Sequence, residues 1–196
     1  CVLVYFWESR QGKLLEAHIY RLSVIPVLYT ESWGLTTISN KIFRMCNSMF
    51  LHGGLGHLLG NMWFLWIFGD NVEDRMGHFR YLLFYLFGGL AAAILHIMLF
   101  PDSTVPIVGA SGAIAAVMGA YLFFFPEATI LAFFPNYYKP FFHIPAFIYL
   151  IFWFLYQLVK GMLDFESSMS GVAFWAHIGG FVFGLILAAP LGGKVR

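Results

Sequence analysis

A serine flanked by small residues is the first side chain in this sequence that could do chemistry. Ser111 stands in the run Gly109-Ala110-Ser111-Gly112, at the start of an apolar stretch that continues to Phe125. A serine hydroxyl becomes a nucleophile when a neighbouring base takes its proton, and histidine is the side chain whose ordinary pKa suits that work near neutral pH. Serine is also a common packing residue in membrane helices, so this motif needs partners elsewhere in the chain.

Two further stretches supply such partners. His57 and Asn61 are four positions apart, which places both side chains on one face of a helix. His177 stands in a third stretch, close to the C-terminus. We predict that His177 is the base for Ser111. The expected donors to an oxyanion are the side chains of His57 and Asn61 and the backbone N–H of Ser111.

The composition points to a membrane as the solvent of this chain. The 196 residues are 60% hydrophobic, 20% aromatic and only 11% charged, with a mean hydropathy of +0.77. A soluble domain of this composition would expose apolar surface to water. The formal net charge of +1 provides no basic face, so nucleic acid is excluded as an expected partner. The cysteines, Cys1 and Cys46, have no paired spacing, and no metal or cofactor is expected.

Five apolar segments are long enough to cross a bilayer, which takes about 20 residues of helix. The predicted spans are 51–69, 80–100, 107–125, 141–163 and 172–191. Residues 1–7 are expected to be the end of a truncated first helix, and residues 8–50 an interfacial loop. The joining loops are expected where charges and turn formers gather, at 70–75, 101–104, 135–140 and 164–168. The prediction is one all-α membrane domain over residues 1–196 with six spanning helices.

The alternating direction of the spans groups the polar residues at one depth. In a six-helix arrangement the second, fourth and sixth helices begin at the same membrane surface. His57 and Asn61 lie in the first half of the second helix, Ser111 in the first turns of the fourth and His177 in the first half of the sixth. Four polar side chains from three helices are therefore expected at a similar depth below one surface.

Small residues beside these side chains predict close helix packing. Gly112 follows the serine directly, and Gly180 and Gly184 follow His177 at helical spacing, which lets helix backbones approach one another. A hydrogen bond between the serine and the histidine requires such an approach. Gly109 and Gly112 are also small enough to admit an extended peptide backbone next to the hydroxyl.

Taken together, these motifs resemble those of the rhomboid family of intramembrane serine proteases, from about Phe50 to the C-terminus. Three patterns of that family, H-x-x-x-N, G-x-S-G and A-H-x-x-G-x-x-x-G, are met in order by His57 and Asn61, by Gly109, Ser111 and Gly112, and by Ala176, His177, Gly180 and Gly184. The resemblance implies a Ser-His dyad in a water-filled cavity. It also implies that the substrates are transmembrane proteins, cleaved near the outer face of the bilayer.

The sequence departs from this family at one informative position. Some relatives carry an aromatic residue four positions after the serine, packed on the catalytic histidine, and here that position is Ala115. The support of His177 must then come from another residue. His52 falls where the family often has a further histidine, and a structural role is expected for it. His96 is expected to be a packing or hydrogen-bonded histidine.

Other functions fit the motifs less well. A zinc membrane protease should contain H-E-x-x-H, which is absent, and a lipase-like hydrolase favours G-x-S-x-G, whereas position 113 is alanine. The alternatives that stay open are a catalytically inactive rhomboid-like scaffold and a small-solute transporter.

Basic residues favour one orientation in the membrane. If the chain starts in the cytoplasm, its inner loops and tail hold a cluster of positive charges: Arg75, Arg80, Lys139, Lys194 and Arg196. We therefore expect a multi-pass protein of the inner cell membrane with its active site toward the outer face.

Overall fold

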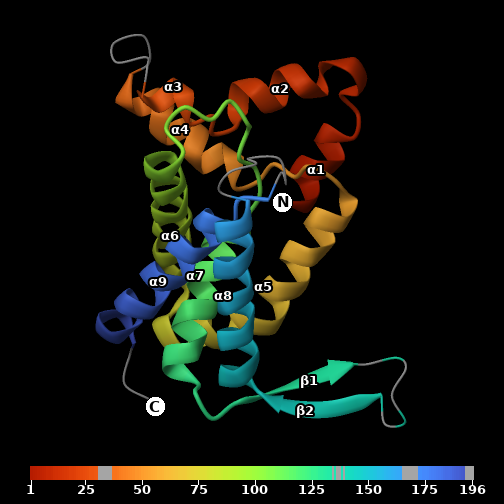
Figure 1. The fold of residues 1–196 in the computed structure, drawn as a ribbon, viewed down its shortest axis with the longest axis vertical. Coiled ribbons are helices and arrows are strands. Elements are labelled where there is room, and N and C mark those ends of the chain that lie inside the picture. The colour runs from red at the N-terminus through yellow and green to blue at the C-terminus, as the bar shows by residue number, and fades with distance from the viewer. Residues whose placement is uncertain (31–36, 134, 136–137, 139, 165–171, 193–196) are drawn as a thin grey trace.

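A computed structural model describes residues 1–30, 37–133, 135, 138, 140–164 and 172–192 of the chain. The chain is mostly helical, as the composition predicts (Figure 1). Of the basic residues that favour an orientation, Lys139, Lys194 and Arg196 lie outside these ranges, and so does most of the expected loop at 164–168.

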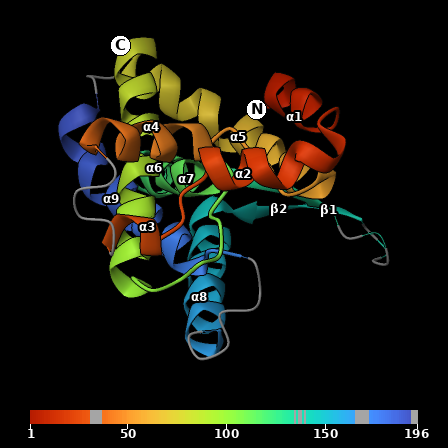
Figure 2. The same ribbon diagram turned by 90° about the horizontal axis from the view of Figure 1, so that it is seen from above.

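Short helices gather at one end of the molecule, and longer ones form the bundle (Figures 1 and 2). The short elements are α1 (Val2–Glu8), the 3-10 turn η1 (Gly12–Leu14), α2 (Leu15–Leu22), α3 (Val27–Thr30) and α4 (Ile38–Ser48). The bundle consists of α5 (Leu55–Met76), α6 (His78–Leu99), α7 (Ser111–Phe124), α8 (Ala146–Leu163) and α9 (Phe174–Leu191). Between α7 and α8, strands β1 (Thr129–Phe133) and β2 (Phe141–Pro145) form an antiparallel hairpin.

Three of the bundle helices are long and apolar enough to cross a bilayer within the described residues, namely α6, α8 and α9. Helix α7 is equally apolar but has only 14 residues. At a rise of 1.5 Å per residue it is about 21 Å long, which is shorter than the hydrocarbon core of a typical bilayer. A residue at an end of α7 can therefore lie inside the membrane rather than at its surface.

Two predicted boundaries are wrong, each for a local reason. The expected loop at 70–75 belongs to α5, which ends only where Gly77 adopts φ +84°, a conformation that stops a helix. The predicted helical start at position 141 is replaced by β2, and α8 begins after Pro145. Proline has no N–H and disfavours a helical conformation in the residue before it, so a helix start just after Pro145 is the natural boundary.

Helix α7 is the centre of the fold, and every residue from Gly112 to Tyr121 is buried. Its most extensive contact is with α9, through glycines on both helices. A Cβ on Gly184 would overlap the Ala116 carbonyl oxygen, and a Cβ on Gly180 would overlap that of Gly112. The two backbones thus touch directly, as the spacing of small residues predicts.

The N-terminal elements hold the loop that leads into α7. Ile107 N–H donates to the Val24 carbonyl at 2.7 Å, and Gly109 N–H donates to the Ser48 carbonyl at 2.8 Å. The Glu8 carboxylate is buried and accepts a hydrogen bond from the backbone N–H of His52 at 3.2 Å. The described part of the predicted interfacial loop, residues 8–30 and 37–50, therefore contains short helices that brace the entrance to α5 and α7.

The contact between α7 and α9 predicts the effect of a single methyl group. In Gly184→Ala the new Cβ has to displace the backbone of Ala116, so we expect a loss of about 1–3 kcal/mol in stability, measured as a lower thermal midpoint in detergent. Gly60→Ala is the matched control, because a Cβ at this position of α5 meets nothing within 4 Å, and alanine favours a helix over glycine by about 1 kcal/mol. Equal midpoints for the two variants would contradict this description of the interface.

Candidate active site

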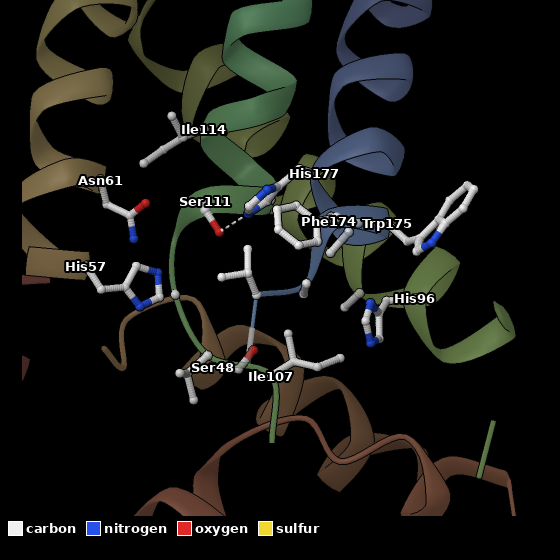
Figure 3. A pocket seen from close by; sticks show the side chains of 18 of the residues that line it. Ser48, His57, Asn61, His96, Ile107, Ser111, Ile114, Phe174, Trp175 and His177 are labelled. Carbon is white, nitrogen blue, oxygen red and sulfur yellow. Dashed lines mark hydrogen bonds between the residues drawn. The ribbon is translucent and has the colours of Figure 1, made fainter. Parts of the chain in front are cut away.

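The structure brings Ser111 and His177 into direct contact (Figure 3). Ser111 is the first residue of α7, and His177 lies in the first turn of α9. The serine Oγ is 2.7 Å from Nε2 of the imidazole, which is hydrogen-bonding distance. The residues are 66 positions apart in sequence, so the close packing of the two helices is what makes this contact possible.

The other imidazole nitrogen is held by a residue of α8. Nδ1 of His177 lies 2.9 Å from Oε1 of Gln157, whose side chain is buried. An amide oxygen only accepts hydrogen bonds, so Nδ1 must carry the proton of the neutral ring. Nε2 then presents its lone pair to the serine hydroxyl. This is the tautomer that a general base for serine requires.

Aromatic rings flank the imidazole from α8 and α9. The ring of Trp153 is centred 6.0 Å from that of His177, and the ring of Phe174 is centred 6.4 Å from it at nearly a right angle. Trp153 and Gln157 are four residues apart on one face of α8. Ala115 on α7 provides no aromatic ring to pack on His177. The support of His177 comes instead from these two residues of α8.

Sequence reasoning did not identify Gln157 or Trp153 as site residues. The available signal was the carboxamide of Gln157 within an otherwise apolar span, since a polar side chain at membrane depth usually faces the interior of a bundle. Its partner on α9 is far away in sequence, and no spacing rule connects the two.

His57 and Asn61 face the serine from α5, across a shared cavity (Figure 3). Gly109, two residues before the serine, adopts φ +116°, and a Cβ there would lie 2.6 Å from Nε2 of His57 and 3.5 Å from Nδ2 of Asn61. A side chain at Gly109 would thus push the α5 residues away. The buried Nδ2 of Asn61 has no hydrogen-bond partner among the described residues, so its N–H groups can serve a bound group.

The start of α7 adds backbone donors beside these side chains. The first N–H groups of a helix have no partner within it, and the helix dipole makes their surroundings positive. Ser111 is the first residue of this helix. Developing negative charge near its hydroxyl would meet the helix N-terminus on one side and Asn61 and His57 on the other.

These side chains line one cavity of about 620 Å³. Its wall includes residues from α5, α6, α7, α8 and α9, among them Asn61, His96, Ser111, Gln157 and His177. The ring of His96 packs on Phe100 with centroids 4.9 Å apart. The cavity is large enough for several peptide residues or a cluster of water molecules.

The glycines of the serine motif have packing roles that their size alone does not reveal. A Cβ on Gly112 would lie 2.6 Å from the Cβ of Ala92 on α6, and Gly109 is packed against His57. Both residues line the cavity, but their missing side chains leave room for protein atoms. The predicted use of these glycines to admit a substrate backbone is therefore secondary to the fit of the helices.

His52 lies in the loop before α5 and supports the neighbouring histidine. Its Nδ1 lies 3.1 Å from the Phe50 carbonyl oxygen, and its ring meets that of His57 edge to face at 5.2 Å. Burial lowers the pKa of His52 to about 4, so the ring is neutral at neutral pH. It brings no positive charge to the cavity.

Metal ligands do not gather in the part of the chain that the structure describes. No three side chains of His, Cys, Asp or Glu converge there as a metal site would require. His78 bonds Glu73 at 2.6 Å at the end of the bundle opposite the cavity.

Comparison with known proteins places this arrangement in a family. A family profile described as the Rhomboid domain matches residues 39–194, which include every residue of the α5, α7, α8 and α9 contacts described above. This chain belongs to the rhomboid family. The resemblance drawn from three short motifs is thus confirmed, and the expectation of an integral membrane protein agrees with its apolar helices.

Individual rhomboids match most of this chain. RHOMBOID-like protein 2 from Arabidopsis thaliana is 34% identical over 169 residues, covering 86% of this chain and 48% of the relative. RHOMBOID-like protein 6, mitochondrial, from the same plant is 30% identical over 84% of this chain and 48% of the relative. Rhomboid protease GluP from Bacillus subtilis is 31% identical over 76% of this chain and 26% of the relative. The chain thus spans about half or less of the length of these relatives.

The geometry predicts selective chemical reactivity of one serine. A fluorophosphonate probe should label Ser111, because His177 can take the hydroxyl proton as the bond to phosphorus forms. Ser111→Ala and His177→Ala should each abolish labelling, as detected by mass spectrometry of the labelled peptide. Ser48→Ala, a change at a serine that also lines the cavity, is the control and should leave the labelling in place. Equal labelling of the parent and of Ser111→Ala would show that the hydroxyl is not activated.

Proposed function

We propose that this chain is an intramembrane serine endopeptidase that cleaves transmembrane segments of other membrane proteins. The observation that carries the proposal is the hydrogen bond of 2.7 Å between Ser111 Oγ and His177 Nε2 at the wall of a cavity within the bundle. Membership of the rhomboid family and the similarity to a relative named as a protease support it.

The chemical steps follow from the hydrogen bonds of His177. Its Nε2 takes the hydroxyl proton while Ser111 Oγ attacks the scissile carbonyl carbon. The imidazolium then gives that proton to the leaving amine, and an acyl-enzyme forms. Water, deprotonated by the same nitrogen, hydrolyses the ester and restores the serine. Gln157 keeps the proton on Nδ1 throughout and accepts a stronger hydrogen bond when the ring is charged.

The oxyanion donors proposed for the tetrahedral intermediate are Asn61, His57 and the backbone N–H of Ser111. Nδ2 of Asn61, which has no partner among the residues that the structure describes, and the position of Ser111 at a helix start support this assignment. One such donor contributes on the order of 3 kcal/mol to the transition state in soluble serine proteases. Gly109 contributes indirectly, because its lack of a side chain allows the α5 residues to come close.

The proposed membrane arrangement follows the predicted six-helix fold, with α5 to α9 as five of the spans. The catalytic end of α7 is placed toward the outer face of the membrane, about one helical turn or more below its surface, because α7 is shorter than the hydrocarbon core. The membrane itself is proposed to be the inner cell membrane. Some relatives are instead named as mitochondrial or chloroplastic proteins.

Removing either member of the dyad should abolish proteolysis. For Ser111→Ala, His177→Ala and the double variant, we expect losses of about 10⁴-fold or more in kcat, with the double variant no worse than either single one, because the residues act as a unit. The measurement is cleavage of a panel of transmembrane reporters by purified protein in liposomes. EDTA should have no effect. Cleavage by Ser111→Ala at the parent rate would refute the assignment.

The same assay separates the open alternatives. A catalytically inactive scaffold would cleave no reporter and would react with no serine-directed probe. A small-solute transporter would instead show solute flux in liposomes that persists after the probe has reacted.

Gln157 should act through the orientation of His177. Gln157→Leu removes a hydrogen bond to a group that becomes charged, which is worth about 1.5–3 kcal/mol or roughly 10- to 150-fold in kcat, with KM unchanged. Gln157→Glu keeps an acceptor for Nδ1–H and should retain more activity. Tyr156→Leu is the control on the adjacent, outward-facing position of α8. Parent-like kcat in the leucine variant would mean that the amide does not position the base.

Substrate selection should depend on how readily the substrate helix unwinds. A helical substrate pairs its own carbonyls, so the scissile segment must unfold before attack. Glycine and proline weaken a helix by about 1 and 3 kcal/mol in soluble hosts, so replacing them by leucine in a cleaved substrate should slow its cleavage. Enlarging the residue before the cut to phenylalanine should slow it too. Rates unchanged by both substitutions would contradict this selection rule and leave the dyad untouched.

A further inference from the structure

The hairpin of β1 and β2 is mostly apolar, and its polar side chains are Thr129 and His143. Its strands read Thr-Ile-Leu-Ala-Phe and Phe-Phe-His-Ile-Pro, with no Asp, Glu, Lys or Arg in either. An antiparallel sheet with one face in water normally alternates apolar and polar side chains. This hairpin lacks that alternation, because Thr129 and His143 share its exposed face with three large apolar side chains. The exposed face is therefore amphipathic, as a surface at a membrane interface is.

One face of the hairpin is open and carries large apolar side chains. Residues along each strand alternate between exposed and half-buried, and Leu131, Phe133 and Phe141 are exposed by 59%, 57% and 59%. Phe133 pairs with Phe141 across the strands, with ring centroids 4.9 Å apart. We call this face the open face; it also carries Thr129 and His143, and His143 is paired with Leu131. The other face is anchored, since Ile130 packs against the core of the bundle.

The hairpin projects sideways from the bundle at the end opposite the cavity. Figures 1 and 2 both show the strands extending past the helices rather than folding back over them. It follows the last turn of α7 and leads directly into α8, with Ala146 N–H bonded to the Ala128 carbonyl oxygen at 2.7 Å. The hairpin is thus held at the level where membrane helices end and the lipid headgroups begin.

Helix α8 follows the hairpin directly and is itself apolar enough to cross a membrane. Phe147, Ile151 and Phe152 in its first turns are exposed by 42%, 45% and 70%. The chain from β2 to Phe152 contains no Asp, Glu, Lys or Arg, so the exposed side chains of the hairpin and of the first turns of α8 suit the same solvent. That solvent is lipid rather than a water-soluble partner.

The backbone limits how deep the hairpin can lie. A two-stranded sheet leaves the outer N–H and C=O groups of each strand unpaired, and these cannot enter hydrocarbon without a large cost. At the boundary between headgroups and acyl chains, water and headgroups can pair with them, while apolar side chains reach about 5–10 Å inward. Only this layer satisfies both the backbone and the side chains.

We propose that the hairpin is a membrane-interface anchor, whose open face inserts into the headgroup and acyl boundary of the leaflet opposite Ser111. It fixes the depth of the α7 end and of the α8 start, to which it is joined. The inference rests on the membrane location of the chain and is independent of its proteolytic function.

The test is site-directed spin labelling in phosphatidylcholine and phosphatidylglycerol liposomes. Single cysteines replace Leu131 and Phe133 in a chain whose two native cysteines, Cys1 and Cys46, are changed to serine. Ile151→Cys on α8 is the lipid reference, and His78→Cys, at the same end of the bundle with a side chain 90% exposed, is the water reference. A circular-dichroism spectrum and a thermal midpoint equal to those of the cysteine-free parent show that each variant is folded.

The expected result is an oxygen-to-nickel accessibility ratio at Leu131 and Phe133 several-fold above that at His78 and below that at Ile151. A ratio equal to that at His78 would place the open face in water and overturn the proposal. Spin–spin broadening at Phe133 that disappears on dilution with unlabelled protein would overturn it in favour of a second copy of this chain as the occupant. A ratio equal to that at Ile151 would overturn the interfacial depth.

Discussion

The direct contact between the backbones of α7 and α9 is the constraint on which the rest of the molecule depends. Gly180 and Gly184 lie against carbonyl groups of α7, so the two helices approach more closely than any side chain would allow. That approach sets the relative height of the helices, and with it the distance from Ser111 to His177. A hydrogen bond tolerates errors of only a few tenths of an ångström, and rigid backbone contacts provide such precision.

The depth of the site is a second consequence of helix geometry. Helix α7 starts late because the preceding segment, up to Gly109, is held outside the helix by backbone bonds to Val24 and Ser48. The first turn of α7 therefore faces a cavity instead of lipid. Irregular backbone within a bundle of membrane helices is tolerated where it lines a cavity, so the shortness of one helix sets both the cavity and the position of Ser111.

Neutral groups support the histidine within the bundle. A carboxylate inside the bilayer costs roughly 2.5–3.5 kcal/mol on insertion scales, whereas an amide can hold the same N–H without bringing a charge. Gln157 makes this contact, and Trp153 packs beside the ring. The buried carboxylate of Glu8 lies at the N-terminal end instead, where a backbone N–H meets it. The groups that contact His177 are thus neutral, and the buried carboxylate lies away from it.

The sequence by itself determined the membrane class through its hydropathy and the family through three short motifs, because both are properties of local stretches of the chain. It predicted Ser111, His177, His57 and Asn61 as site residues. It also predicted the close packing at Gly180 and Gly184. Only the tertiary structure decided which group supports His177, why Gly109 has no side chain, and where α7 begins. Those answers depend on contacts between segments dozens of residues apart. The hairpin was missed for a related reason. The sequence of β2 is apolar and adjoins α8, so by composition it resembles part of that helix, and only its pairing with β1 identifies it as a strand.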